Sequence, residues 1–161
     1  KAYYAVSGGG ITLSGGEPMF QFDFCLNLLK SAKNSGIHTC METSGMAPTE
    51  NFTETANYTD LFLFDIKAIN NDKHIAYTGM SNELILKNLH HLYSLGKEIV
   101  LRCPIIPGVN DAEEDINQIN LLKKKYNLIK CVEFLPYHDF GKDKCLELGN
   151  EYKLQEIQKT N

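Results

Sequence analysis

The apolar positions of the chain fall into two patterns, short continuous runs and longer stretches at helical spacing. The short runs predict buried strands, which are Gly10–Leu13, Ile37–Met41, Leu61–Ile66, Glu98–Cys103 and Cys131–Leu135. The longer stretches predict helices over Phe22–Ser35, Thr49–Asn57 and Ser81–Leu95, from Asp111 onward, and in the tail from Glu151. Apolar strands that alternate with helices are typical of a parallel sheet covered by helices.

The length of the chain limits how far such a sheet can close. With 161 residues the chain has the size of one domain. A complete eight-stranded barrel needs roughly 250 residues, so that architecture is excluded. We therefore expect a single α/β domain over residues 1–161.

Composition and charge exclude several classes of function. The net charge is −4 and no basic stripe is present, which argues against duplex nucleic acid as a partner. No apolar run reaches the roughly 18 residues of a membrane span, and the first residues lack the order of a secretory signal. The five cysteines are odd in number and widely spaced, so each is expected to be a small buried hydrophobe. These features predict a cytoplasmic location.

Polar residues follow every predicted strand. The first strand leads into Ser14–Pro18, the second into Glu42–Gly45, the third carries Asp65 and Lys67, the fourth carries Arg102, and the fifth leads into Pro136–His138. Because parallel strands end at the same edge of a sheet, these groups are expected to lie together. The pattern predicts a small-molecule site at that edge.

The glycine-rich stretch after the first strand differs from the known phosphate loops. Gly10 and Gly15 have phosphate-loop spacing, but Gly16 stands where that motif needs lysine. Gly15 and Gly16 allow the backbone to approach a ligand closely, and Glu17 then offers a carboxylate or a carbonyl to a cationic group. A plain tight turn is the alternative.

Three further charged residues stand at strand ends. Asp65 and Lys67 are two residues apart and point to the same face of their strand, either as a structural ion pair or as a pair that faces a ligand. Arg102 lies between two apolar residues and needs an anion, for which a carboxylate is well suited. His138 is on a loop, where a positioned histidine is more often functional than part of a core.

Six segments in order carry a resemblance to a known family. They are GGGITLSGGEP, IHTCMETSG, LFLFDIKAINNDKH, TGMSN, LRCPIIPGVND and EFLPYHDFGKDK, between about Gly8 and Tyr152. Together they resemble the radical S-adenosylmethionine (SAM) activating enzymes of glycyl-radical enzymes. The resemblance implies a partial, open parallel (β/α) barrel, of which this chain supplies about five of six strands.

The resemblance also implies an activity. In this family a [4Fe–4S] cluster reduces SAM to methionine and a 5′-deoxyadenosyl radical, which removes a hydrogen atom from a glycine of a partner enzyme. The implied partners are a glycyl-radical enzyme such as pyruvate formate-lyase or a relative, and an electron donor such as flavodoxin or ferredoxin. The implied SAM-binding residues are Gly15, Gly16, Glu17, Asp65, Ile66, Lys67, Arg102 and His138. A monovalent cation is implied at Glu42, Thr43, Asp65 and the carbonyl of Leu63.

One family motif is missing from the sequence. The family binds its cluster through CxxxCxxC, and no such spacing occurs here. We therefore expect the C-terminal portion of a larger activating enzyme, inactive in isolation. A non-catalytic module that binds SAM or docks on a partner, and an unrelated α/β enzyme or binding protein that uses the same edge, are the alternatives.

Overall fold

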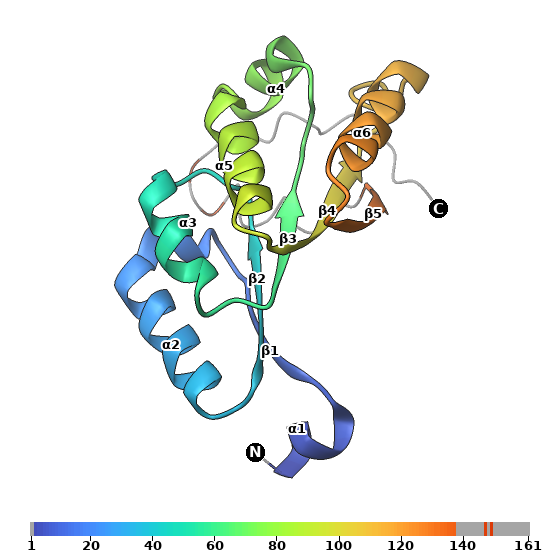
Figure 1. Cartoon of the computed structure of the whole chain (residues 1–161). Coiled ribbons are helices and arrows are strands. Elements are labelled where there is room, and N and C mark those ends of the chain that lie inside the picture. Colours follow the sequence, from blue (N-terminus) through green and yellow to red (C-terminus); the bar gives the residue numbers. More distant parts are fainter. Residues whose placement is uncertain (1, 138–146, 148, 150–161) are drawn as a thin grey trace.

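The computed structural model describes residues 2–137, 147 and 149 (Figure 1). Its centre is a five-stranded parallel sheet with the strand order β1-β2-β3-β4-β5. The strands are β1 (Gly10–Leu13), β2 (His38–Thr43), β3 (Leu61–Asp65), β4 (Glu98–Ile105) and β5 (Ile129–Pro136). Strands that follow one another in sequence are also neighbours in space, as in a (β/α) barrel. The expected α/β fold is confirmed.

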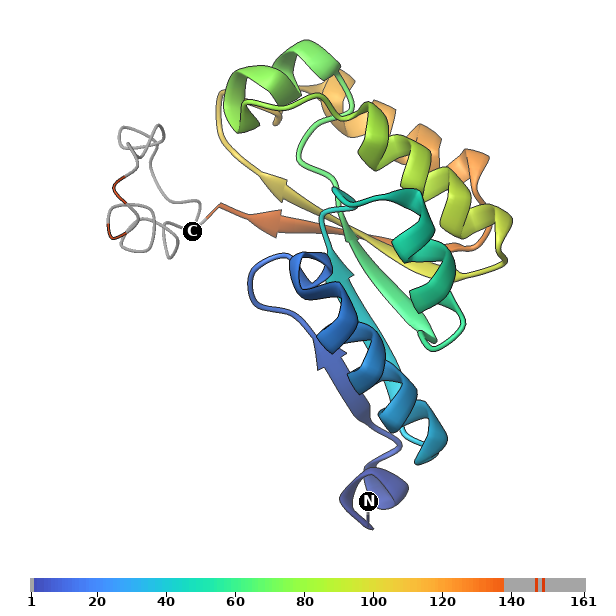
Figure 2. The same cartoon turned by 90° about the vertical axis from the view of Figure 1, so that its left-hand side faces the viewer.

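Helices cover one face of this sheet. They are α2 (Phe22–Asn34), α3 (Thr49–Ala56), α4 (Asn71–Thr78), α5 (Glu83–Ser94) and α6 (Glu113–Lys125). A short helix α1 (Ala2–Ser7) precedes β1, and a 3-10 turn η1 (Pro18–Gln21) leads into α2. Figure 2 shows α2, α3, α5 and α6 side by side along this face. None of the helices in the described part of the chain has the length and apolar character needed to cross a membrane.

The core lies between this face of the sheet and the helices. Met41, Phe62, Phe64, Ile99 and Leu101 point from the strands into the core and have no exposed surface. Helix residues at apolar spacing meet them, and these are Leu29, Phe52, Leu89, Leu92 and Ile119. Burial of each such side chain contributes about 1.5–3 kcal/mol.

On the face of the sheet that points away from the helices, the strand register aligns the residues in rows. Glu42 pairs with Leu63, Leu63 with Val100, and Val100 with Cys131. The next row towards the carboxyl ends joins Asp65, Arg102 and Glu133. Since successive side chains alternate between faces, these residues point away from the helices. A charged row therefore borders the site edge.

Several element boundaries differ from the prediction. The strand predicted from Ile37 begins at His38 and runs to Thr43, and the helix predicted from Asp111 begins at Glu113. Helix α4 was not predicted, because its apolar spacing is weak. It is defined by its ends, where the Asn70 side chain accepts from Lys73 N and Gly79 adopts a φ of 80°. The predicted tail helix from Glu151 lies outside the described residues.

Candidate functional site

The carboxyl edge of β1, β2 and β3 surrounds a hollow of about 180 Å³. The turn after β1, the end of β2 and the end of β3 all contribute to its wall. The lining residues are Ser14, Gly15, Gly16, Glu17, Glu42, Thr43, Ser44, Asp65 and Lys67. The sequence predicted that these strand ends meet, and the structure brings them together. Binding pockets for whole drug-sized ligands measure about 300–1,000 Å³, so this hollow suits one end of a larger molecule.

The Glu17 carboxylate lies within this wall and binds the chain's own groups. Its Oε1 accepts from Thr43 Oγ1 at 2.8 Å and from Met19 N at 3.3 Å. Its Oε2 accepts from Ser44 N at 2.8 Å and from Ser44 Oγ at 2.6 Å. A carboxylate offers about four acceptor positions, and these contacts use them. The sequence predicted that either the carboxylate or the backbone carbonyl of Glu17 meets a cationic group. The carboxylate instead connects the β1 turn to the end of β2.

Arg102 lies at the centre of the charged row. Its Nη1 is 2.8 Å from Glu42 Oε1, and its Nε is 3.5 Å from Glu133 Oε2. Ser14 Oγ donates to the other oxygen of Glu42 at 2.9 Å. The sequence predicted that Arg102 needs an anion. The chain itself supplies it, in the carboxylates of Glu42 and Glu133. Among the described residues, Arg102 Nε is the buried side-chain nitrogen or oxygen that lacks a hydrogen-bond partner.

Asp65 and Lys67 form the predicted pair, with Lys67 Nζ 3.4 Å from Asp65 Oδ2. Burial raises the pKa of the Asp65 carboxyl, because a desolvated carboxylate is less stable than its neutral form, and nearby Glu42 raises it further. The charges of Lys67 and Arg102 oppose this increase in pKa. The Lys67 side chain is 44% exposed, so its ammonium is accessible to a ligand at the hollow.

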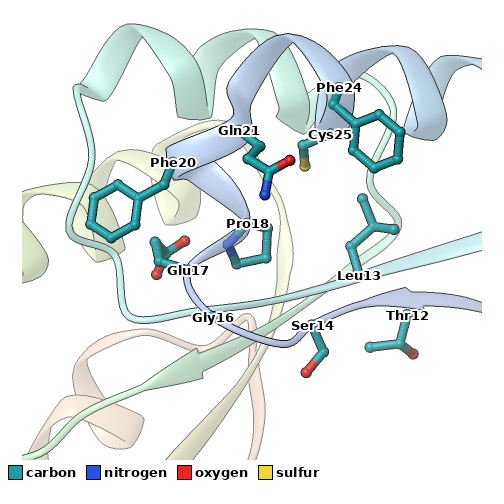
Figure 3. A pocket seen from close by; sticks show the side chains of 10 residues that line it. All are labelled: Thr12, Leu13, Ser14, Gly16, Glu17, Pro18, Phe20, Gln21, Phe24 and Cys25. Atoms are coloured by element: carbon teal, nitrogen blue, oxygen red, sulfur yellow. The ribbon is translucent and has the colours of Figure 1, made fainter. Parts of the chain in front are cut away.

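A second hollow of about 370 Å³ lies along the turn after β1 and the start of α2 (Figure 3). It shares Ser14, Gly16 and Glu17 with the first hollow, and Phe20 and Phe24 form part of its wall. These two rings are 82% and 67% exposed. The wall of the second hollow therefore contains exposed apolar rings, unlike the charged row.

The cysteines of the described part do not fit an iron–sulfur cluster. Burial raises the pKa of the Cys25 thiol to about 11 and that of Cys103 to about 12, as expected for small buried hydrophobes. Within residues 2–137, 147 and 149, no three Cys, His, Asp or Glu side chains are grouped as metal ligands.

The remaining predicted site residues lie in different surroundings. The Ile66 side chain is buried in the core and its N–H donates to Arg102 O at 2.9 Å, so only its backbone faces the site edge. Thr43 is buried and its hydroxyl is directed at Glu17, while Leu63 lies next to Glu42 in the strand register. His138 lies outside the described residues.

Sequence reasoning missed Glu133, and it placed Ser44 at the end of the second strand without predicting its contacts to Glu17. Glu133 is the only charged residue in the last predicted strand, Cys131–Leu135, and a charge inside an apolar strand could have marked it as a partner for Arg102. Ser44 donates to Glu17 through both its backbone N–H and its hydroxyl, and no residue pattern indicates these contacts.

Comparison with known proteins shows which proteins the chain is similar to. A model of the Radical SAM superfamily matches residues 2–119. The trans-4-hydroxy-L-proline dehydratase activating enzyme of Clostridioides difficile is 44% identical over the whole chain, which spans 54% of that protein. The pyruvate formate-lyase-activating enzyme of Staphylococcus epidermidis is 38% identical over 98% of the chain, which spans 65% of that protein. The chain thus spans less than two thirds of these relatives.

A solved structure supports the same fold. The crystal structure of a domain of pyruvate-formate lyase-activating enzyme from Bacteroides vulgatus matches 95% of this chain and 86% of its own, with a TM-score of 0.76 and 27% identity. The match agrees with the parallel sheet and its helical cover.

Proposed function

The chain belongs to the radical SAM superfamily, and from this premise we propose that it forms the SAM-holding part of an activating enzyme for glycyl-radical enzymes. The observation that carries this proposal is the hollow at the carboxyl edge, where SGGE, ETS and DIK meet from three adjacent strands. Its volume of about 180 Å³ suits the methionine end of SAM, with the remainder of the molecule outside it.

The residues at this edge complement the two charges of an amino acid. We assign the methionine carboxylate to the Lys67 ammonium and to the guanidinium of Arg102, whose Nε–H makes an ion pair with Glu133 but no hydrogen bond among the described residues. We assign the methionine ammonium to the backbone carbonyls around Gly15 and Gly16, because the Glu17 carboxylate is engaged by Met19, Thr43 and Ser44. Asp65 and the Ile66 backbone border the same edge, and His138 stays a predicted contact to the ribose and adenine.

A monovalent cation beside Glu42 and Asp65 is a further part of the proposal. These two carboxylates repel each other enough for Glu42 to raise the pKa of Asp65, and a cation between them would relieve this repulsion. Leu63 and Thr43 would contribute backbone carbonyls, because the Thr43 hydroxyl is directed at Glu17.

The chemistry requires groups beyond this site. In the complete enzyme a [4Fe–4S] cluster would supply an electron to SAM, and SAM would supply the radical that takes a hydrogen atom from a glycine of the partner enzyme. The names of the relatives, as activating enzymes of a dehydratase and of pyruvate formate-lyase, support a glycyl-radical enzyme as the partner. A flavodoxin or ferredoxin is the proposed electron donor. The four described cysteines are free, which suits the reducing cytoplasm.

We further propose that the domain is part of a larger barrel. Within the described part of the chain, the outer edge of β1 has no strand beside it. Phe20, Phe24 and Leu28 lie at i, i+4 spacing and are exposed at 82%, 67% and 37%, where a further helix would be expected to pack.

Isothermal titration of the chain with SAM tests the binding part of the proposal. We expect saturable binding that weakens by roughly 10- to 100-fold in Lys67→Ala and in Arg102→Ala, because each removes a charge-assisted contact. Lys87→Ala is the matched control, since Lys87 is exposed on the outer helix α5 and should leave the affinity unchanged. Absence of SAM binding by the native chain would contradict the proposal.

Anaerobic reconstitution tests the cluster part of the proposal. We expect the chain, treated with iron and sulfide, to retain no stoichiometric cluster, because CxxxCxxC is absent from its sequence. The measurement is the iron content after desalting, together with the visible absorbance. One cluster per chain would show that other residues ligate it. The lack of CxxxCxxC would then be no reason for the chain to be inactive.

A further inference from the structure

Asn110 connects the segment that follows β3 to the end of β4 and to the loop beyond it. Its side chain is almost completely buried, with an exposed fraction of 2%. Its Nδ2 donates to Lys67 O at 2.7 Å and to Pro104 O at 2.8 Å, and its Oδ1 accepts from Ile106 N at 2.7 Å. All of these partners are backbone groups, so the amide determines the path of two loops at once.

The strand pairing explains why this amide is needed. The ladder between β3 and β4 ends with the pair Asp65–Arg102 and the hydrogen bond from Ile66 N to Arg102 O. Pro104 has no N–H and cannot continue the ladder. Beyond this point the carbonyls of Lys67 and Pro104 need donors from elsewhere, and Asn110 supplies both.

A second buried asparagine holds the next two residues of the same segment. Asn82 Nδ2 donates to Ala68 O at 3.0 Å and to Ile69 O at 2.8 Å. The carbonyls of three consecutive residues, 67–69, are therefore bound by buried amides. The backbone of Lys67 is fixed, although its side chain is 44% exposed and extends to within 3.4 Å of Asp65.

We propose that Asn110 is a positioning residue for the SAM site, which holds the Lys67 backbone so that the lysine ammonium lies beside Asp65 at the edge of the hollow. The ligand in this statement depends on the proposed function, whereas the effect of Asn110 on Lys67 does not. Asn110 itself touches no reacting atom in this assignment.

Asn88 provides a matched control within the same chain. It is fully buried, its Nδ2 donates to Gly45 O and to Ala47 O at 2.8 Å each, and its Oδ1 accepts from Thr49 Oγ1 at 2.7 Å. Asn88→Ala thus removes three hydrogen bonds, as Asn110→Ala does, two of them likewise to backbone carbonyls, but in the loop after β2. A merely structural loss would affect both variants alike.

The first measurement is the rate at which each lysine of the folded chain is acetylated, resolved by mass spectrometry. We expect Lys67 to react several-fold faster in Asn110→Ala, while the other lysines keep their native rates. Asn88→Ala should leave the Lys67 rate unchanged. Circular dichroism confirms that both variants are folded, and Asn110→Ser, which retains one hydroxyl donor, replaces the alanine variant if that variant fails to fold.

The second measurement is a double-mutant cycle on SAM binding by the same chain. We expect Asn110→Ala to weaken binding about tenfold when Lys67 is present and to have little effect in Lys67→Ala, because the two residues act as one unit. Asn88→Ala and Lys67→Ala should be additive.

The outcomes separate the two proposals. A Lys67 acetylation rate that rises no more than those of the other lysines would overturn the positioning role, as would additive effects of Asn110→Ala and Lys67→Ala on SAM affinity. A native chain that does not bind SAM would overturn the proposed function, while the acetylation rates would still decide whether Asn110 positions Lys67.

Discussion

At the scale of single residues, the carboxyl edge is organised by side chains that bind the chain's own backbone. Glu17 connects the β1 turn to β2, and Asn110 connects the ends of β3 and β4. Lys67 retains an exposed ammonium, and the Nε–H of Arg102 makes an ion pair with Glu133 but no hydrogen bond among the described residues. The edge thus combines a fixed frame with a few groups directed at a ligand.

The first prediction concerns Glu17. Glu17→Ala removes a carboxylate that accepts from Met19, Thr43 and Ser44, so we expect the free energy of unfolding to fall by roughly 2–3 kcal/mol. Urea unfolding measures this change. Glu54→Ala is the control, because Glu54 is exposed on α3 and its loss should cost less than about 0.5 kcal/mol. Equal stability of the two variants would show that the Glu17 contacts contribute little.

The second prediction concerns the buried thiols. The pKa of Cys103 is raised by burial from 9.0 to about 12, so the unfolded chain loses this proton at lower pH than the folded chain does. The contribution of Cys103 to stability is therefore complete below pH 9 and is lost as the pH rises from 9 towards about 12. Within that range it falls by about 1.4 kcal/mol per pH unit.

Urea unfolding of the native chain and of Cys103→Ala at pH 8, 9.5 and 10.5 checks this prediction. The variant is expected to be less stable at pH 8, because it leaves a cavity, but its stability should fall less steeply with pH. Subtracting the pH dependence of stability of the variant from that of the native chain removes the effect of all other titrating groups. Parallel slopes would mean that the Cys103 thiol ionises equally well in the folded chain.

At the scale of elements, the strands could be predicted from sequence and the loops between them could not. The runs LFLFD and EIVLRC are apolar enough to predict β3 and β4, and the polar residues that follow them predicted where the site lies. The roles of Asn82, Asn88 and Asn110 could not be predicted, because an asparagine in a loop has many possible partners. Only the folded chain shows which carbonyls they bind.

The turn after β2 gives the third prediction. Gly45 has a φ of +78°, and a Cβ at this position would lie 2.3 Å from Cζ of the buried Phe64 ring. We expect Gly45→Ala to lower the free energy of unfolding by roughly 2–5 kcal/mol, through backbone strain and displacement of the ring.

Gly36→Ala separates these two causes. Gly36 has a similar φ of +70°, but a Cβ there would meet nothing within 4 Å. Only the backbone strain applies, so this variant should lose about 1 kcal/mol. Urea unfolding of both variants tests the contrast, and similar losses would show that the Phe64 ring adapts to the added methyl group.

At the scale of the whole molecule, the sheet is covered by helices on one face and leaves strand edges open. Among the described residues, β1 and β5 each have a neighbouring strand on one side only. The edge at β1 lies beside the exposed rings of Phe20 and Phe24. An open strand edge next to exposed apolar side chains favours association between copies.

The last prediction is therefore that the isolated chain self-associates through the β1 edge. Light scattering over a range of concentrations should show a mass that rises above 18.2 kDa. Phe24→Lys should reduce this rise, because it places a charge on the apolar stripe beside β1. Leu121→Lys is the control, since Leu121 is 60% exposed but lies on α6, which packs at β5 rather than at β1. A native chain that stays monomeric at high concentration, or a loss of association in both variants alike, would show that the β1 edge does not drive association.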